Sequence, residues 1–169
     1  MSHISAGVEY GLHCLLYLSG PPTGVTEASV RDLAELQGLS VEFVAKLFTK
    51  LRKAGLTEAT EGKNGGFRLA KPADRISVLD VVEAIDGPKA LFECREIRGR
   101  CAVFDGAAPR WAMDGVCSIH AVMLEAEDRM RQVLSSQTLA DLARHVGAKA
   151  PHSHAGKVVH WIETRKEQA

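Results

Sequence analysis

Three cysteines and a histidine in the second half of the chain are the residues best suited to bind a metal. Cys94, Cys101, Cys117 and His120 are separated by six, fifteen and two residues. Thiolates are the soft ligands that hold iron–sulfur clusters, and an imidazole can complete such a site. Glycines in the intervening stretch make it pliable enough to gather these side chains. The spacing therefore indicates a metal or redox sensor.

Cys101 has a second interpretation. The long gap after it separates it from the other candidate ligands, and it directly follows Arg100. A neighbouring positive charge lowers a thiol pKa, so Cys101 could instead be an activated thiol. Cys14 lies within the apolar run CLLYL, which favours a small core residue over a ligand.

Composition narrows the class of protein. No apolar run reaches the roughly 18 residues of a membrane span, so no membrane partner is expected. The first twenty residues lack the basic start of a signal peptide. We therefore expect a cytoplasmic protein, in which four cysteines are metal ligands or reactive thiols more often than disulfides.

The sequence from Val30 to Lys71 predicts the element that these ligands would control. Two short helical patterns meet at Gly38, and the second carries one apolar stripe with helical spacing, formed by Val44, Leu47, Phe48 and Leu51. Leu56–Thr60 and Phe67–Leu69 then flank a glycine-rich turn, as in a β-hairpin. This order predicts a winged helix-turn-helix, and hence a mainly α fold with a small β-wing.

The second helix of such a pair enters the major groove of duplex DNA. Net charge is zero, with 21 basic and 21 acidic residues. The segment from Val44 to Lys71, however, contains seven basic residues and only two acidic ones. A solvated helix face beside an ordinary hairpin, or a winged helix used only for protein contact, would give the same pattern. The predicted DNA-contacting residues are Ser40, Glu42, Ala45, Lys46, Lys50, Arg52, Lys63, Asn64 and Arg68.

We expect four segments along the chain. Residues 1–87 form the winged helix-turn-helix domain, and residues 88–117 form a sensor loop with little periodicity. Residues 118–146 form a long helix with apolar residues on one side, followed by a short helix capped by Thr138. Residues 147–169 are polar and expected to be a flexible tail.

Several stretches resemble the Rrf2 family of bacterial winged helix-turn-helix transcription regulators, which includes the iron–sulfur regulators IscR, NsrR and RsrR. They are MSHISAGVEYGLHCLLYL, LAELQGLSVEFVAKLFTKLRKAGL, GKNGGFRLAKP, ISVLDVVEAIDGP and TLADL. The resemblance covers Ile4 to about Val146. It implies a homodimer joined by the long C-terminal helix and a palindromic operator in double-stranded DNA. It also implies an iron–sulfur cluster in the loop before that helix, whose state controls DNA binding.

The motifs GVEYGLH and FECREIRGR are most similar to the RsrR-type branch. That branch implies a 2Fe-2S cluster held by Cys94 and Cys117 together with Glu9 and His13 of helix one, expected from the partner subunit. Glu9 and His13 are spaced i, i+4 and so project from one helix face, as an ordinary surface pair also would. The alternate ligands are Cys101 and His120.

The sequence thus predicts a dimeric DNA-binding transcription regulator that senses redox or iron–sulfur status through a bound cluster. An enzyme is not expected, because no nucleophile–base constellation or phosphate loop is evident. Two alternatives stay open. One is a cluster-free switch in which Cys94, Cys101 or Cys117 form a reversible disulfide, and the other is a regulator whose loop binds a small organic effector.

Overall fold

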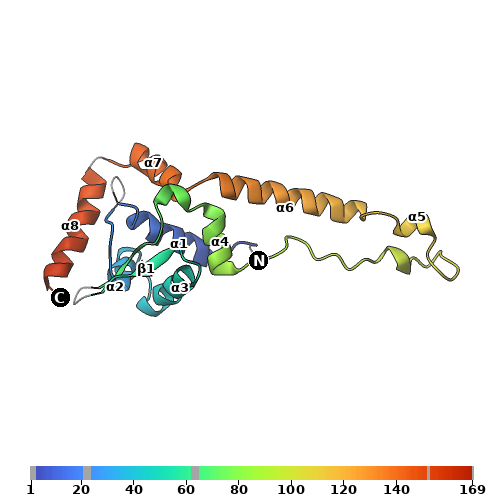
Figure 1. Cartoon of the computed structure of the whole chain (residues 1–169), viewed down its shortest axis with the longest axis horizontal. Helices are drawn as coiled ribbons and strands as arrows, with labels where there is room; N and C mark the ends of the chain where they lie inside the picture. The colour runs from blue at the N-terminus through green and yellow to red at the C-terminus, as the bar shows by residue number, and fades with distance from the viewer. Residues whose placement is uncertain (1–2, 21–23, 62–64, 152, 169) are drawn as a thin grey trace. The chain divides into compact units, whose positions relative to one another are not determined.

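The computed structural model describes residues 3–20, 24–61, 65–151 and 153–168, and divides the chain into two compact units. The first unit comprises residues 1–88 and 134–169, and the second comprises residues 89–133. The described residues are mainly helical, with one two-stranded antiparallel sheet (Figure 1). This confirms the predicted fold class.

In the first unit, α1 (Ala6–Tyr17) and α4 (Val78–Asp86) pack closely. Gly11 of α1 allows this approach, because a Cβ at this position would lie 2.4 Å from Cδ1 of Ile85. At the start of α1, the backbone N–H and the hydroxyl of Ser5 donate hydrogen bonds of 2.8 and 2.5 Å to the carboxylate of Asp86. Packing and hydrogen bonds therefore hold the two helices as a pair.

The helix-turn-helix consists of α2 (Val30–Leu36) and α3 (Val41–Lys53). Serine caps begin both helices: Ser29 accepts a hydrogen bond from the backbone N–H of Asp32, and Ser40 accepts one from the backbone N–H of Phe43. Gly38 has φ +64° and so makes the turn in the left-handed region. The predicted stripe of α3 is buried in the core, which confirms the orientation of this helix.

The hairpin pairs β1 (Thr57–Ala59) with β2 (Phe67–Leu69), with Glu58 opposite Arg68. Ala28 adds an isolated antiparallel bridge to Phe67. Gly66 is required there, because a Cβ would lie 2.4 Å from the carbonyl oxygen of Ala28. The sheet thus joins the start of the helix-turn-helix to the wing.

Two capping boxes fix the elements that follow the wing. After the short 3-10 turn η1 (Ala73–Arg75), Ser77 and Asp80 cap α4, and Thr138 and Asp141 cap α7 (Leu139–Lys149). Ser77 and Thr138 also form an isolated bridge. The two helix starts therefore lie side by side, and the cap at Thr138 agrees with the sequence-based expectation.

The C-terminal segment differs from the expected flexible tail. Ser153–Gln168 form the helix α8, and Val158 and Ile162 are part of the hydrophobic core. The guanidinium of Arg165 forms ion pairs with Asp32 at 3.2 Å and Glu35 at 2.5 Å, and lies over the ring of Trp161. The polar composition concealed this helix, because only a few apolar side chains are enough to attach it beside α2.

The second unit contains more structure than the expected loop. A 3-10 turn η2 (Arg98–Arg100) packs against α5 (Arg110–Met113). Ala112 of α5 is buried. The long helix α6 (Ser118–Ser136) follows and has no buried residue. Several of its apolar side chains are exposed: Ile119, Val122 and Val133 are each 64% accessible.

Candidate functional site

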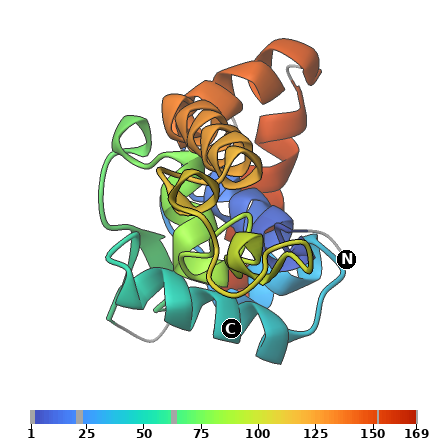
Figure 2. The same cartoon turned by 90° about the vertical axis from the view of Figure 1, so that its right-hand side faces the viewer.

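The outer face of α3 is the predicted DNA-contacting surface. Glu42, Ala45, Lys46 and Arg52 are exposed on this helix, and Ser40 is exposed at its N-terminus. Figure 2 shows α3 along one edge of its unit. Lys63 and Asn64 of the predicted wing tip lie outside the described residues.

Two of the predicted DNA-contacting side chains already have partners within the protein. The ammonium group of Lys50 donates a 2.5 Å hydrogen bond to the backbone carbonyl of Ile85, near the end of α4. The guanidinium of Arg68 forms a 2.6 Å ion pair with Glu58 across the hairpin. Lys50 therefore links α3 to α4, a role that the sequence pattern did not reveal.

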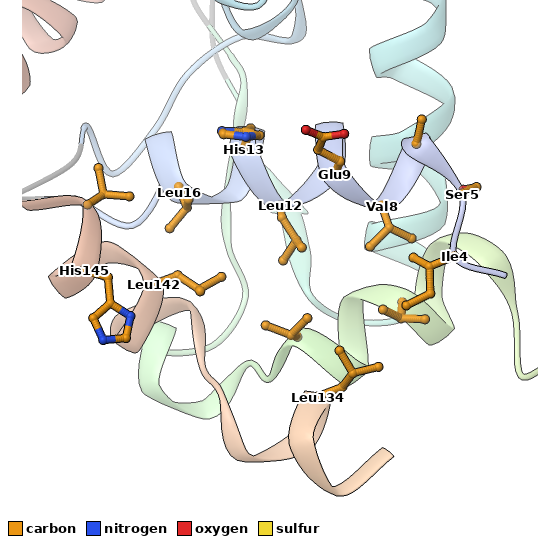
Figure 3. Close-up of a pocket in the computed structure, with 14 residues that line it drawn as sticks. Ile4, Ser5, Val8, Glu9, Leu12, His13, Leu16, Leu134, Leu142 and His145 are labelled. Atoms are coloured by element: carbon orange, nitrogen blue, oxygen red, sulfur yellow. The ribbon is translucent and has the colours of Figure 1, made fainter. Parts of the chain in front are cut away.

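Glu9 and His13 lie exposed and side by side on one face of α1 (Figure 3). Val8, Leu12 and Leu16 point from the other side of this helix into an apolar pocket of about 640 Å³. Helices α4 and α7 and the end of α6 complete the lining. The carboxylate and the imidazole thus stand at the rim of an apolar groove.

A second pocket, of about 350 Å³, gathers candidate ligands within residues 89–133. Cys94, Cys117 and His120 line it, and all three are half-buried. The ring of Phe92 lies 6.1 Å from that of His120. Cys101 is exposed and does not line this pocket. The pocket therefore brings together two of the four implied ligands and one alternate.

Arg98 connects the two cysteine-bearing segments of this pocket. Its guanidinium donates to both carboxylate oxygens of Glu96, at 2.6 and 2.8 Å. It also donates to the backbone carbonyls of Asp114 at 3.3 Å and of Gly115 at 3.1 Å, just before Cys117. The motif FECREIRGR contains this arginine, but its partners could not be inferred from the sequence.

Arg98 lines the same pocket as both cysteines. Its hydrogen bonds with Glu96 raise the pKa of Arg98, and the charges of Cys117 and Cys94 raise it further. In return, the hydrogen bonds from Arg98 lower the pKa of Glu96. The pocket thus combines two thiols with the ion pair of Arg98 and Glu96.

The donor set fits part of the coordination of an iron–sulfur cluster. Two half-buried thiols on one pocket supply the soft ligands that such a cluster needs. Within the described part of the chain, no three His, Cys, Asp or Glu side chains are assembled to hold a metal ion.

Comparison with known proteins identifies relatives of the chain. A family model described as Rrf2, an iron-dependent transcriptional regulator, matches residues 4–145. The protein rrf2 of Nitratidesulfovibrio vulgaris (strain Hildenborough) is 40% identical over 116 residues, which cover 69% of this chain and 71% of that protein.

Solved structures agree with this match. The structure of CymR (YrzC), the global cysteine regulator of B. subtilis, matches with a TM-score of 0.65 and 26% identity, over 86% of this chain and 98% of that one. The IscR of T. potens matches with a TM-score of 0.62 and 24% identity, over 89% and 93% of the two chains, and shows the shared fold.

These relatives regulate transcription, which confirms that the protein is not an enzyme. In the described part of the chain, no helix has the length and apolar character needed to cross a membrane. Through the family match over residues 4–145 and the 40% identical relative, the chain belongs to the Rrf2 family of transcriptional regulators.

Proposed function

We propose that this Rrf2 regulator acts as a homodimer that binds a palindromic operator and senses redox or iron–sulfur status through a 2Fe-2S cluster. Cys94 and Cys117 would hold the cluster together with Glu9 and His13 of the partner subunit. The observation that carries this proposal is the single pocket lined by both cysteines. The iron-dependent description of the family supports the same chemistry.

The exposed apolar face of α6 supports the dimer. Ile119, Val122, Ala126 and Val133 are all exposed and follow a spacing close to heptad positions a and d. Such a seam is costly in water and is normally covered by another helix. A second copy of α6 would cover it and so make α6 the dimerisation helix.

The apolar groove beside α1 supports a partner there as well. Its lining is almost entirely aliphatic, while Glu9 and His13 remain at the rim. A partner subunit that covers the groove would bring its own pocket residues near this rim. Cys101 would stay outside the ligand set, and His120 would be the alternate ligand.

Binding of DNA would use α3 in the major groove and the wing beside it. The exposed side chains of Glu42, Ala45 and Lys46 would face base edges or phosphates, with Arg52 and Arg68 near the backbone. Two half-sites must be spaced to match the two recognition helices of the dimer. A small change in the tilt of α3 would therefore change operator affinity.

When bound, the cluster would supply one-electron redox chemistry. Glu9 and His13 would act as its hard ligands, and Cys94 and Cys117 as its thiolates. Ligation would hold α1 in one position, and release of Glu9 or His13 would free it. Because α1 also contacts α3, the populations of binding-competent and binding-incompetent dimers would shift.

Anaerobic purification tests this proposal. Iron and sulfide assays should give about two of each for every complete set of four ligands. The reduced protein should show the electron paramagnetic resonance signal of a mixed nitrogen/oxygen-ligated 2Fe-2S centre. Double alanine replacement of Cys94 and Cys117 should remove both signals, and Cys101→Ala should retain them. A colourless protein with full, redox-independent operator affinity would contradict the cluster.

A cluster-free thiol switch is the second candidate. Two solved relatives are described as a global cysteine regulator and as the oxidised form of CymR from Staphylococcus aureus. The shared pocket of Cys94 and Cys117 is compatible with a reversible disulfide between them. Non-reducing mass spectrometry together with iron analysis separates this switch from a cluster. A regulator of small organic effectors would keep its response after both cysteines are replaced.

A further inference from the structure

We infer that Arg98 is a positioning residue of the proposed cluster site, joining the segment that carries Cys94 to the turn that precedes Cys117. The inference rests on the proposed function for the identity of the bound group. The contacts of Arg98 themselves are independent of any occupant.

The guanidinium reaches both segments at once. Nη1 and Nη2 donate to the carbonyls of Asp114 and Gly115, which lie three and two residues before Cys117. Nε and Nη2 donate to Glu96, which lies two residues after Cys94. Planar donors in a fixed fork suit this task, whereas a lysine ammonium is a single point charge.

Glu96, the partner of Arg98, has an unusual backbone conformation. Its φ of +44° lies in the left-handed region, and it is the one non-glycine residue with positive φ in the described part of the chain. That conformation is strained for a residue with a Cβ. The hydrogen bonds with Arg98 offset this strain and fix the bend between Cys94 and η2.

The position of the charge gives Arg98 a second effect. Arg98 lines the pocket together with Cys94 and Cys117, whereas Arg100 of the same turn is exposed and does not line it. Reduction potentials of iron–sulfur centres depend on nearby charge and on hydrogen bonding. A cation at this place stabilises the more negative, reduced form, so its removal should lower the midpoint potential.

Three variants separate geometry from charge. Arg98→Gln removes the charge and most donors, Arg98→Lys keeps the charge alone, and Arg100→Gln removes the same charge from the adjacent exposed position. Iron retention against a chelator and the midpoint potential are measured on anaerobic, full-length protein. We expect both Arg98 variants to lose iron about tenfold more readily than wild type. Only Arg98→Gln should also lower the midpoint potential, and Arg100→Gln should resemble wild type in both measurements.

The outcome that overturns the inference is equal behaviour of Arg98→Gln and Arg100→Gln. Iron loss from Arg98→Gln with an unchanged midpoint potential would also overturn it, because general unfolding of the loop would produce that result. If Arg98→Gln retains too little iron for a redox titration, the iron retention of Arg98→Lys still tests the positioning role of Arg98.

Hydrogen–deuterium exchange on the iron-free protein tests the contact without any cluster. Arg98→Gln should raise exchange in the segments 93–99 and 112–118 together, and Arg100→Gln in neither. If wild type binds no iron but these segments respond together, the cluster proposal fails and the contact stands. If wild type binds the cluster and neither segment responds, the proposed function stands and the role of Arg98 fails.

Discussion

The ring of Tyr10 meets the ring of Phe43 edge to face, with 5.7 Å between their centroids and an interplanar angle of 87°. Tyr10 follows Glu9 on α1, and Phe43 follows Glu42 on α3. The pair therefore connects the helix with two proposed ligands directly to the recognition helix. Neither residue was a candidate in the sequence, because an aromatic pair between two helices cannot be read from either helix alone.

Replacing Tyr10 by Leu should weaken the dependence of operator affinity on the cluster. The leucine retains apolar packing and removes an aromatic contact worth about 1 kcal/mol. The ratio of operator affinities between the cluster-bound and cluster-free proteins should therefore fall by up to about fivefold. Fluorescence anisotropy with operator DNA measures both forms. Tyr10→Phe keeps the ring and should behave as wild type. An unchanged affinity ratio in Tyr10→Leu would show that the contact of Tyr10 with Phe43 does not couple α1 to α3.

A charge on the exposed face of α6 should dissociate the dimer. Val122→Glu places a carboxylate in the proposed apolar seam, and burying it without a partner costs several kcal/mol. Light scattering after size-exclusion chromatography should show a monomer, with weakened operator binding. Ala121→Glu adds the same charge one position away on an exposed side of α6 and should remain dimeric. A dimeric Val122→Glu would place the interface elsewhere.

Acid stability should depend on Asp141. The backbone N–H and hydroxyl of Thr138 lower the pKa of Asp141, with smaller contributions from Arg144 and His145. The pKa of Asp141 in the folded protein lies below its ordinary value. The ionised carboxylate therefore stabilises the fold at pH values above the ordinary pKa. Its contribution is lost as pH falls through the lowered pKa.

Urea unfolding of wild type and Asp141→Asn checks this dependence. Wild type should be the more stable protein at neutral pH, and the difference should shrink as the solution is acidified through the carboxyl range. Asp105→Asn, which removes a carboxylate from an exposed position in the other unit, serves as the control. A difference that is constant with pH would exclude the ionised capping carboxylate as its source.

Cys14 should be chemically inert in the folded protein. Burial raises the pKa of its thiol to about 12, so it stays protonated at pH 8. The side-chain amide of Gln37 lies 3.3 Å from its sulfur. Iodoacetamide followed by mass spectrometry should modify the exposed Cys101 and leave Cys14 unmodified until denaturant is added. Rapid native labelling of Cys14 would contradict its burial.

The helix α8 should stabilise the DNA-binding unit. Ile162 is fully buried, so Ile162→Ala should lower the free energy of unfolding by about 2–5 kcal/mol. His160→Ala, at an exposed position two residues earlier, should have little effect. Calorimetry or urea unfolding distinguishes the two variants. Equal stability of Ile162→Ala and wild type would mean that α8 is detached in solution.

The sequence predicted those features that local physics determines. The apolar stripe of α3, the glycine at the turn and the cap at Thr138 all depend on residues within a few positions of one another. Each therefore leaves a readable pattern. The same reasoning placed Cys14 in the core, because its neighbours on α1 are apolar.

Features that depend on residues far apart in the sequence could not be predicted from the sequence. Arg165 pairs with Asp32 across 133 residues, so nothing near either one predicts α8 on α2. The contacts of Arg98 with Asp114 and Gly115 span 16 and 17 residues, and nothing beside Arg98 in the sequence indicates them. Lys50 looked like a DNA ligand because its charge is visible in the sequence, whereas its acceptor on α4 is not.

At Gly11, hydrogen is the largest substituent that the neighbouring Ile85 tolerates without moving. A larger side chain at this position would therefore require Ile85 to move. The carbonyl of Ile85 in turn receives the ammonium of Lys50 from the recognition helix. Ile85 thus contacts both the first helix and the recognition helix, so a change in its position would affect both.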